Sequence, residues 1–164
     1  MKACSPKVIN KRYCSVTNLP TLFKETDKSP TLLDVKLTYG HDYLYQYLTI
    51  WIIEIIEVGG IENNISEDRL TQAIEISFRD YLNVITLADM KLFFDYAING
   101  KLVDNGNNTG YFIKMNARTL SIWIKKYVSM RIEYAQEESI NEASNYKESS
   151  IRDFGIKSIK DVNR

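Results

Sequence analysis

The sequence predicts a mainly α-helical protein, a compact bundle of about five helices with one β-hairpin between the fourth helix and the long last helix. Three observations support this fold class. Apolar residues recur at three- and four-residue steps along most of the chain, helix-start and helix-stop residues bracket these segments, and one Gly- and Asn-rich stretch interrupts them. A chain of 164 residues, 45% hydrophobic and 26% charged, has the length and composition of one globular domain.

The first two predicted helices are bounded by clear start and stop signals. Ser29 and Pro30 are typical N-cap and first helical residues, so we expect a helix over 31–39 that stops at Gly40. A second helix over 42–58 ends at a Gly-Gly pair. Its apolar positions cover most of its circumference, which is typical of the buried centre of a bundle. A membrane span is the alternative, but three polar residues interrupt the run, and it is shorter than the ~20 residues that a bilayer requires.

Two more helices and a hairpin are expected in the middle of the chain. Residues 66–81 begin with acidic residues in the first turn, which favour a helix start. Residues 86–89 resemble a capping box, with Asp in place of the usual Glu, and open a fourth helix that closes at Asn99-Gly100. Residues 101–115 predict the hairpin, because their central loop is dense in residues that accept left-handed backbone angles. A calcium loop is the alternative, but the order of ligand residues does not fit.

The last helix is expected from 117 to about 145, capped by Asn116. Its apolar pattern thins after Ala135, so we expect the second half to lie in solvent or against a partner. The domain organisation that follows has three parts. These are a basic N-terminal arm over 1–28, a helical domain over 29–146 with the hairpin at 101–115, and a C-terminal tail over 147–164.

Residues that carry catalytic or metal chemistry are sparse. His41 is the single histidine and stands between two predicted helices, where a helix-terminal role is expected. Together with Cys4 and Cys14 it cannot supply the four ligands of a zinc site. No phosphate-binding or nucleophile motif occurs. We therefore expect a non-enzymatic protein without cofactor, metal site or small-molecule substrate. The two cysteines and the absence of an apolar leader predict a cytoplasmic location.

The last helix carries the candidate contact residues. Lys114, Arg118 and Lys125 stand at spacings of four and seven, with Lys126 beside them, so they align on one basic stripe. We consider these four as candidate nucleic-acid or partner contacts, against the simpler interpretation of a solvated helix face. The candidate partner face consists of three aromatic residues of the same helix, Trp123, Tyr127 and Tyr134.

A winged helix-turn-helix is the structural alternative for nucleic-acid binding. In that interpretation 88–98 is the recognition helix and 104–110 is the tip of the wing. The expected recognition helix offers Asp89, Lys91 and Asp95 around two phenylalanines, which is a poor set for reading base edges. The net charge of zero also argues against strong nonspecific binding to DNA.

Four motifs follow one another in the second half of the chain: Ile85–Phe94, Gly100-Lys101, Gly110-Tyr111-Phe112, and the series Trp123, Tyr127 and Arg131 at four-residue steps. Through the order of these motifs, residues 29–140 resemble a group of small uncharacterised helical proteins of bacteriophages and mobile elements. The relatives tend to have a shorter, tyrosine- and glycine-rich hairpin, from which 104–110 departs. The resemblance implies a phage or mobile-element setting and no particular activity.

Three functions remain open at this point. The leading expectation is a protein–protein interaction adaptor in phage replication or host takeover, acting in the bacterial cytoplasm. The first alternative is a nucleic-acid-binding accessory of the replisome. The second is a virion structural or cargo protein that assembles with itself or with other virion components.

Overall fold

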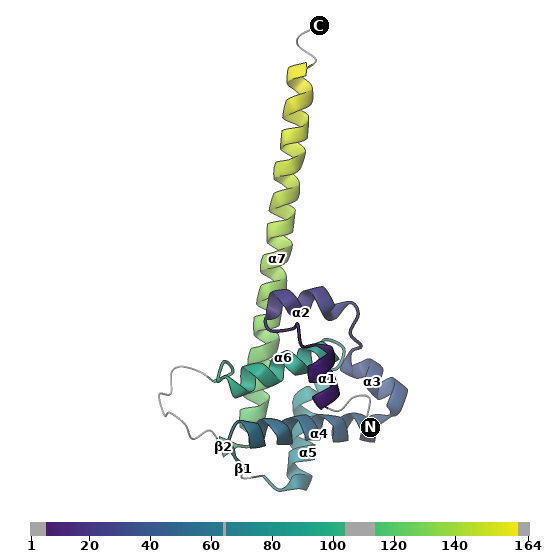
Figure 1. The fold of residues 1–164 in the computed structure, drawn as a ribbon, viewed down its shortest axis with the longest axis vertical. Coiled ribbons are helices and arrows are strands. Elements are labelled where there is room, and N and C mark those ends of the chain that lie inside the picture. The colour runs from purple at the N-terminus through teal and green to yellow at the C-terminus, as the bar shows by residue number, and fades with distance from the viewer. Residues whose placement is uncertain (1–5, 64, 104–113, 161–164) are drawn as a thin grey trace. The chain divides into compact units, whose positions relative to one another are not determined.

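The structure, a computed structural model, describes residues 6–63, 65–103 and 114–160 of the chain and is mainly helical (Figure 1). Seven α-helices and one two-stranded parallel sheet lie in these ranges. They divide into two compact units, Met1–Tyr127 and Val128–Arg164, so α7 belongs to both. The elements are α1 (Pro6–Arg12), α2 (Leu19–Thr26), α3 (Leu32–Tyr39), α4 (His41–Val58), β1 (Glu62–Asn63), α5 (Glu67–Phe78), the 3-10 helix η2 (Arg79–Tyr81), α6 (Leu87–Ile98), β2 (Lys114–Met115) and α7 (Ala117–Lys160).

The described part of the expected N-terminal arm is folded. Residues 6–28 contain α1 and α2, and both helices pack against α6. Ile9, Val16 and Leu22 are buried within this unit. Over these residues, the segment that the sequence suggested as a basic arm is therefore helical and packed. The helices are short and separated by a turn, so their apolar residues show no continuous period along the sequence.

The centre of the first unit is α6, which packs against α1, α2 and α4. Its side chains are buried on almost every side, including the charged ones of Asp89 and Lys91. Aromatic contacts join it to its neighbours, with ring centroids 5.4 Å apart for Trp51 and Phe94 and 5.6 Å apart for Phe93 and Tyr127. As predicted, α4 is also largely buried, with Trp51 fully inside. In the described ranges, no helix has both the length and the apolar character needed to span a bilayer.

The starts of α3 and α6 lie side by side. Thr31 and Thr86 form an isolated antiparallel bridge, and each is the N-cap of its own helix. Ser29, which the sequence predicted as the cap of α3, instead accepts a hydrogen bond from the Ala88 backbone N–H at 3.0 Å. Ser29 therefore caps the neighbouring helix α6, which a local sequence pattern does not reveal.

The prediction of a β-hairpin is wrong for the part of 101–115 that the structure describes. β2 pairs with β1 in parallel, with Glu62 opposite Lys114 and Asn63 opposite Met115. The expected first strand, 101–103, forms turns and a bend. The expected wing tip and the rest of the hairpin, 104–113, lie outside the described residues. A distant segment of the chain therefore supplies the partner of β2.

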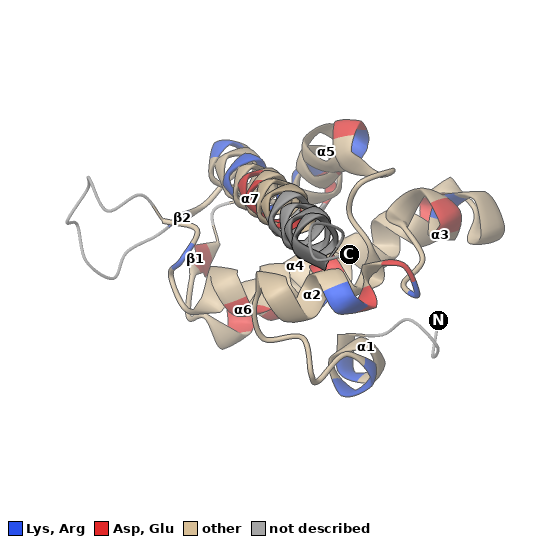
Figure 2. Ribbon diagram, turned by 90° about the horizontal axis from the view of Figure 1, so that it is seen from above, with Lys and Arg blue, Asp and Glu red and all other residues tan. Residues whose placement is uncertain are grey.

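The second unit, taken by itself, is a helix. Within it α7 continues to Lys160, well past the expected end near 145 and into the expected tail over 147–164. In the view of Figure 2, which looks nearly along α7, acidic and basic residues both stand on the described part of this helix. The thinning of the apolar pattern after Ala135 suggested an earlier end, but polar residues such as Glu and Gln are themselves good helix formers.

Candidate partner-binding surface

Two of the four predicted basic contacts are engaged within the first unit. The Lys114 ammonium lies 3.3 Å from a Glu62 carboxylate oxygen, across the two strands. The Lys126 ammonium donates a hydrogen bond to the Val103 carbonyl oxygen at 2.8 Å. Each contact competes with a phosphate for the same cation. Lys114 of the predicted basic stripe therefore links β2 to β1, and Lys126 links α7 to the turn at Val103.

The other two basic residues are exposed. Arg118 and Lys125 stand seven residues apart on α7, so they share one helix face. Over the described ranges, neither forms an ion pair. A pair of cations can contact one or two phosphates, which is far fewer than the number that supports strong nonspecific binding.

Two of the three aromatic residues of the predicted partner face are inside the first unit. Trp123 is 3% exposed and Tyr127 is fully buried, so the prediction that they present a partner face is corrected. Tyr127 packs edge-on against Phe93 and Tyr96. The four-residue spacing of Trp123 and Tyr127 is the same for a core face as for an exposed face, so spacing alone cannot separate these cases.

Tyr134 belongs to the second unit and is partly exposed. Its hydroxyl interacts with Glu138 one turn along the helix, and this hydrogen bond raises the pKa of the Tyr134 hydroxyl. Of the predicted aromatic face, Tyr134 is thus the member that remains accessible. Its ring can contact a partner while its hydroxyl is held by its own helix.

A buried polar network joins α6 to α7. The Asp89 carboxylate, fully buried, accepts hydrogen bonds from the Thr86 backbone N–H at 2.9 Å, the Thr86 hydroxyl at 2.7 Å and the Tyr127 hydroxyl at 2.8 Å. A buried charge persists in a protein interior when such donors surround it. The capping box was predicted from the sequence, whereas the link to Tyr127 was not.

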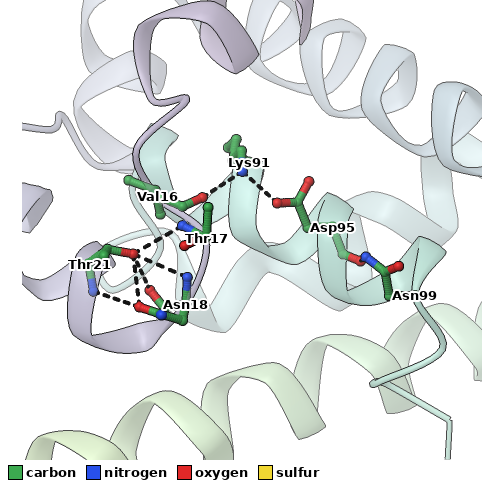
Figure 3. A network of polar contacts seen from close by, with 7 residues as sticks. All are labelled: Val16, Thr17, Asn18, Thr21, Lys91, Asp95 and Asn99. Atoms are coloured by element: carbon green, nitrogen blue, oxygen red, sulfur yellow. Dashed lines mark hydrogen bonds and ion pairs between the residues drawn. The ribbon is translucent and has the colours of Figure 1, made fainter.

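A second polar network fixes the N-terminal helices on α6 (Figure 3). The buried Lys91 ammonium donates to the Val16 carbonyl oxygen and pairs with Asp95 one turn further along α6. Asn18 and Thr21 form a capping box beside it that starts α2. Lys91 therefore serves the fold, and its charge is compensated within the protein.

These two networks overturn the winged-helix interpretation of α6. A recognition helix needs one face free for the major groove, yet Asp89, Lys91 and Phe93 are all buried. Lys91 is bonded to Val16 and Asp95. The helix predicted to read DNA is instead the core helix of the first unit.

A groove of about 450 Å³ contains the single histidine and lies between α4 and α5. The His41 ring nitrogens face two carboxylates, Glu75 at 3.1 Å and Asp42 at 3.3 Å, and the ring packs on Tyr45 with centroids 4.5 Å apart. Burial raises the pKa of the Tyr45 hydroxyl, and the charge of Glu75 adds to this. Because both nitrogens already face a carboxylate, His41 ties the first turn of α4 to α5, as the helix-terminal role predicted.

The described half of α7 in the second unit has an accessible apolar face. Ile132 is 47% exposed and Ile140 is 65% exposed. A shallow groove of about 470 Å³ runs along this face. Its lining residues, which form two adjacent rows at four-residue steps, are Arg131, Ile132, Ala135, Gln136, Ser139 and Ile140. The sequence indicated this region only by a weakened pattern, because Ile140 stands among glutamates.

Neither a metal centre nor a known relative indicates what kind of site this is. Among the residues described, no group of three or more His, Cys, Asp or Glu side chains is placed to hold a metal ion. Comparison with known proteins found no matching family model, no similar curated protein and no similar solved structure.

Proposed function

We infer that the protein is a non-enzymatic adaptor that binds another protein through the Val128–Tyr146 portion of α7. The observation that carries this proposal is the exposure of large apolar side chains along a helix that forms a unit of its own. The resemblance of residues 29–140 to proteins of bacteriophages and mobile elements adds the setting, a bacterial cytoplasm during phage or element replication.

Physical chemistry favours a covered face for such a helix. A helix without tertiary contacts is marginal in water, and most helical stability in proteins comes from packing one apolar face. Ile132 and Ile140 each present about half or more of their side chain to solvent. A partner groove that accepts these two isoleucines would bury their apolar surface. Each Å² of apolar surface removed from water contributes about 25 cal/mol to the free energy of binding. Helix-in-groove recognition uses anchor residues at this kind of spacing.

The residues that could carry chemistry are committed to structure in the first unit. His41 faces Asp42 and Glu75, and Asp89 is held by Thr86 and Tyr127. These contacts support a scaffold role for the first unit. We therefore place binding on the surface, and in the second unit Ile132 and Ile140 are the exposed apolar side chains that a partner could cover.

A nucleic-acid-binding accessory remains the second candidate, on the observation that Arg118 and Lys125 share an exposed face of α7. Its affinity would fall steeply with salt, with a slope set by the number of phosphates contacted. A Lys125→Glu variant that weakens DNA binding while Lys24→Glu does not would support it. Lys24 is an exposed lysine of α2 and provides the matched control.

The experiment for the adaptor compares two surfaces by affinity capture from infected and uninfected host lysate, with nuclease. The test variant is Ile132→Ser combined with Ile140→Ser, and the control is Ile76→Ser on α5, where the isoleucine is 59% exposed. We expect a stoichiometric protein partner that the control retains and the test variant loses. Equal capture by both variants would contradict the proposal, and capture abolished by nuclease would favour nucleic-acid binding.

A further inference from the structure

The groove between α4 and α5 in the first unit is lined by one continuous face of α4. Its lining positions on this helix recur at alternating steps of three and one, so they follow one another over three turns, about 16 Å along the helix axis. They are Asp42, Tyr45, Gln46, Thr49, Ile50 and Ile53. Thr71 and Glu75 of α5 form the opposite wall, and His41 lies at the end where α4 begins. A groove of this length and of about 450 Å³ can hold a ligand longer than a single side chain.

The two ends of this groove differ in their chemistry. At the start of α4, the carboxylates of Asp42 and Glu75 flank the His41 ring, and the Glu75 side chain is 47% exposed. Further along α4 stand Ile50, which is 42% exposed, and Ile53, which is partly exposed. Among the lining residues, all of which the structure describes, none is Lys or Arg. The groove is therefore apolar at one end and carries carboxylates at the other.

A buried tyrosine of this groove has a hydroxyl group without a partner. Tyr45 is 4% exposed, and its contacts are the packing of its ring on His41 and the hydrogen bond that its backbone carbonyl accepts from Thr49. Over the described part of the chain, its hydroxyl forms no hydrogen bond. Burial and then the charge of Glu75 raise the pKa of Tyr45, so the Glu75 carboxylate acts at this hydroxyl. Buried polar groups normally have a partner, and a ligand in the groove can supply the missing one.

The charges of the two helices favour a cationic ligand. Together α4 and α5 contain six Asp or Glu residues and one arginine. The next basic residue along the chain, Arg79, pairs with Asp80 at 3.4 Å. The charge of these helices thus adds to that of Asp42 and Glu75, and a field of one sign attracts ligands of the opposite sign.

We propose that the groove binds a basic and apolar peptide segment of a partner protein. A lysine or arginine side chain of this segment pairs with Glu75 and donates a hydrogen bond to the Tyr45 hydroxyl oxygen, while aliphatic side chains cover Ile50 and Ile53. A free organic amine has the same cationic group, but a peptide also spans the three turns of α4 between the carboxylates and the isoleucines. The site consists of residues of the first unit, so it goes beyond the surface of α7 proposed above and gives the adaptor a second binding surface.

The first test selects peptides from a random display library on the immobilised full chain. We expect the enriched peptides to combine Lys or Arg with aliphatic residues. They should lose binding to the Ile50→Ser variant and keep binding to Ile76→Ser, which changes an exposed isoleucine of α5 outside the groove. Circular dichroism confirms that each variant is folded. Enrichment of acidic peptides, no enrichment at all, or equal binding to the two variants would overturn the inference.

The second test measures the preference for charge by fluorescence anisotropy of one enriched lysine peptide. The preference is the dissociation constant of the peptide with norleucine in place of lysine, divided by that of the parent peptide. We expect a ratio of about 3 to 5, the size of a partly exposed ion pair, that decreases with salt.

Variants of the groove assign this preference to the Glu75 carboxylate. Glu75→Gln should bring the ratio close to one, and Tyr45→Phe should lower it, whereas Glu57→Gln, at an exposed glutamate of α4 outside the groove, should leave it unchanged. His41→Gln should also keep it, because this change leaves the carboxylate in place. If His41→Gln and Glu75→Gln lower the ratio equally, Glu75 acts only by holding His41, and the proposed ion pair is wrong.

Competition with n-hexylammonium separates a peptide from a free amine as the occupant. We expect this amine to displace the peptide only at concentrations at least ~10-fold above the dissociation constant of the peptide, because it makes fewer contacts along the groove. Displacement at a concentration equal to that constant would overturn the peptide as occupant and identify the groove as a site for small amines.

The second unit provides the control that separates this inference from the proposed function. Ile132→Ser combined with Ile140→Ser should leave binding of the selected peptides unchanged. If this variant loses them, the peptides bind α7, which overturns the groove as their site and leaves the adaptor in place. If the peptides depend on Ile50 and Glu75 while lysate capture is the same for the α7 variant and Ile76→Ser, the groove stands and the proposed function of α7 is wrong.

Discussion

Two helix starts in this protein share the pattern Thr-Leu-x-Asp, at Thr31–Asp34 and Thr86–Asp89, and differ in their surroundings. In both, the aspartate side chain accepts from the threonine backbone N–H and hydroxyl, and the threonine hydroxyl accepts from the aspartate backbone N–H. Each helix start is therefore a capping box. The distances from the threonine backbone nitrogen and hydroxyl oxygen to the aspartate oxygen are 2.8 and 2.7 Å in the first box, and 2.9 and 2.7 Å in the second. The local geometry therefore follows from the four residues alone.

The energetic roles of the two boxes differ because their burial differs. Asp34 is exposed, whereas Asp89 is fully buried and accepts a further hydrogen bond from the Tyr127 hydroxyl. A carboxylate in water can exchange its partners for solvent, but a buried one cannot. The comparison shows that sequence determines the shape of a cap, and tertiary packing determines how much stability depends on it.

The largest expected effect is the loss of the buried carboxylate. Asp89→Ala should lower the free energy of unfolding by about 3–4 kcal/mol, since it leaves the donors of Thr86 and Tyr127 buried without an acceptor. Urea denaturation followed by circular dichroism measures this. Asp34→Ala is the matched control in the exposed box and should have a much smaller effect. If both variants lose the same free energy of unfolding, burial does not determine how much each capping box contributes to stability.

Tyr127→Phe tests the contact that only the buried box has. It removes one hydrogen bond to a charged group and keeps the aromatic packing, so we expect a loss of about 1.5–3 kcal/mol in the same denaturation experiment. Tyr39→Phe, at a tyrosine that is 56% exposed, provides the control and should leave stability unchanged. If Tyr127→Phe proves neutral, Asp89 is satisfied without α7.

A smaller difference is expected between the two threonines. Thr86→Ala should cost about 2 kcal/mol and Thr31→Ala about 1 kcal/mol, the upper and middle of the range for N-cap replacements. Thr86 is 2% exposed, so the backbone N–H groups it serves cannot turn to water. Thermal melts of both variants would check the order, and a larger cost for Thr31→Ala would reverse the comparison.

The smallest effect is a dependence on pH. The hydrogen bonds from the Thr31 hydroxyl, and then from its backbone N–H, hold the pKa of Asp34 below its ordinary value of 3.8. Because the folded-state pKa is the lower one, the contribution of Asp34 is fully present above pH 3.8 and is lost as the pH falls through the folded-state pKa. Carboxyl titration by NMR should show the lowered pKa, and Thr31→Ala should return it toward 3.8.

The sequence predicted the elements better than it predicted their surroundings. The helices over 31–39, 42–58 and 86–98 were expected from caps, glycines and apolar spacing, and each of these signals acts within a few residues. The exposure of Trp123 was predicted wrongly, because a stripe of apolar residues at four-residue steps does not say which side faces a neighbour. The hydrogen bond from the Ala88 backbone N–H to the Ser29 hydroxyl oxygen joins segments 59 residues apart, so no local sequence pattern predicts it.

The sequence predicted that the candidate surface lies on α7, but not which residues of that helix are accessible. Lys114 and Lys126 were expected to face a partner, but Glu62 and the Val103 carbonyl oxygen occupy them. The second half of α7 was expected to lie in solvent or against a partner, and Ile132 and Ile140 are indeed exposed there. The contacts of Lys114 and Lys126 bring together residues from different elements, so they could not be predicted from local sequence. The exposure of a polar helix face follows from the residues of that helix, so it could.

The central position of α6 has a consequence for the order of events during synthesis. α1 and α2 leave the ribosome first, but the helix on which they pack is made much later, and the Lys91 contact to Val16 spans 75 residues. Closing so long a loop carries an entropic cost before any packing is gained. Until residues 87–98 emerge, Ile9, Val16 and Leu22 have no α6 to cover them. The nascent chain thus carries these apolar residues exposed until α6 has been made, the interval in which chaperones and aggregation compete for them.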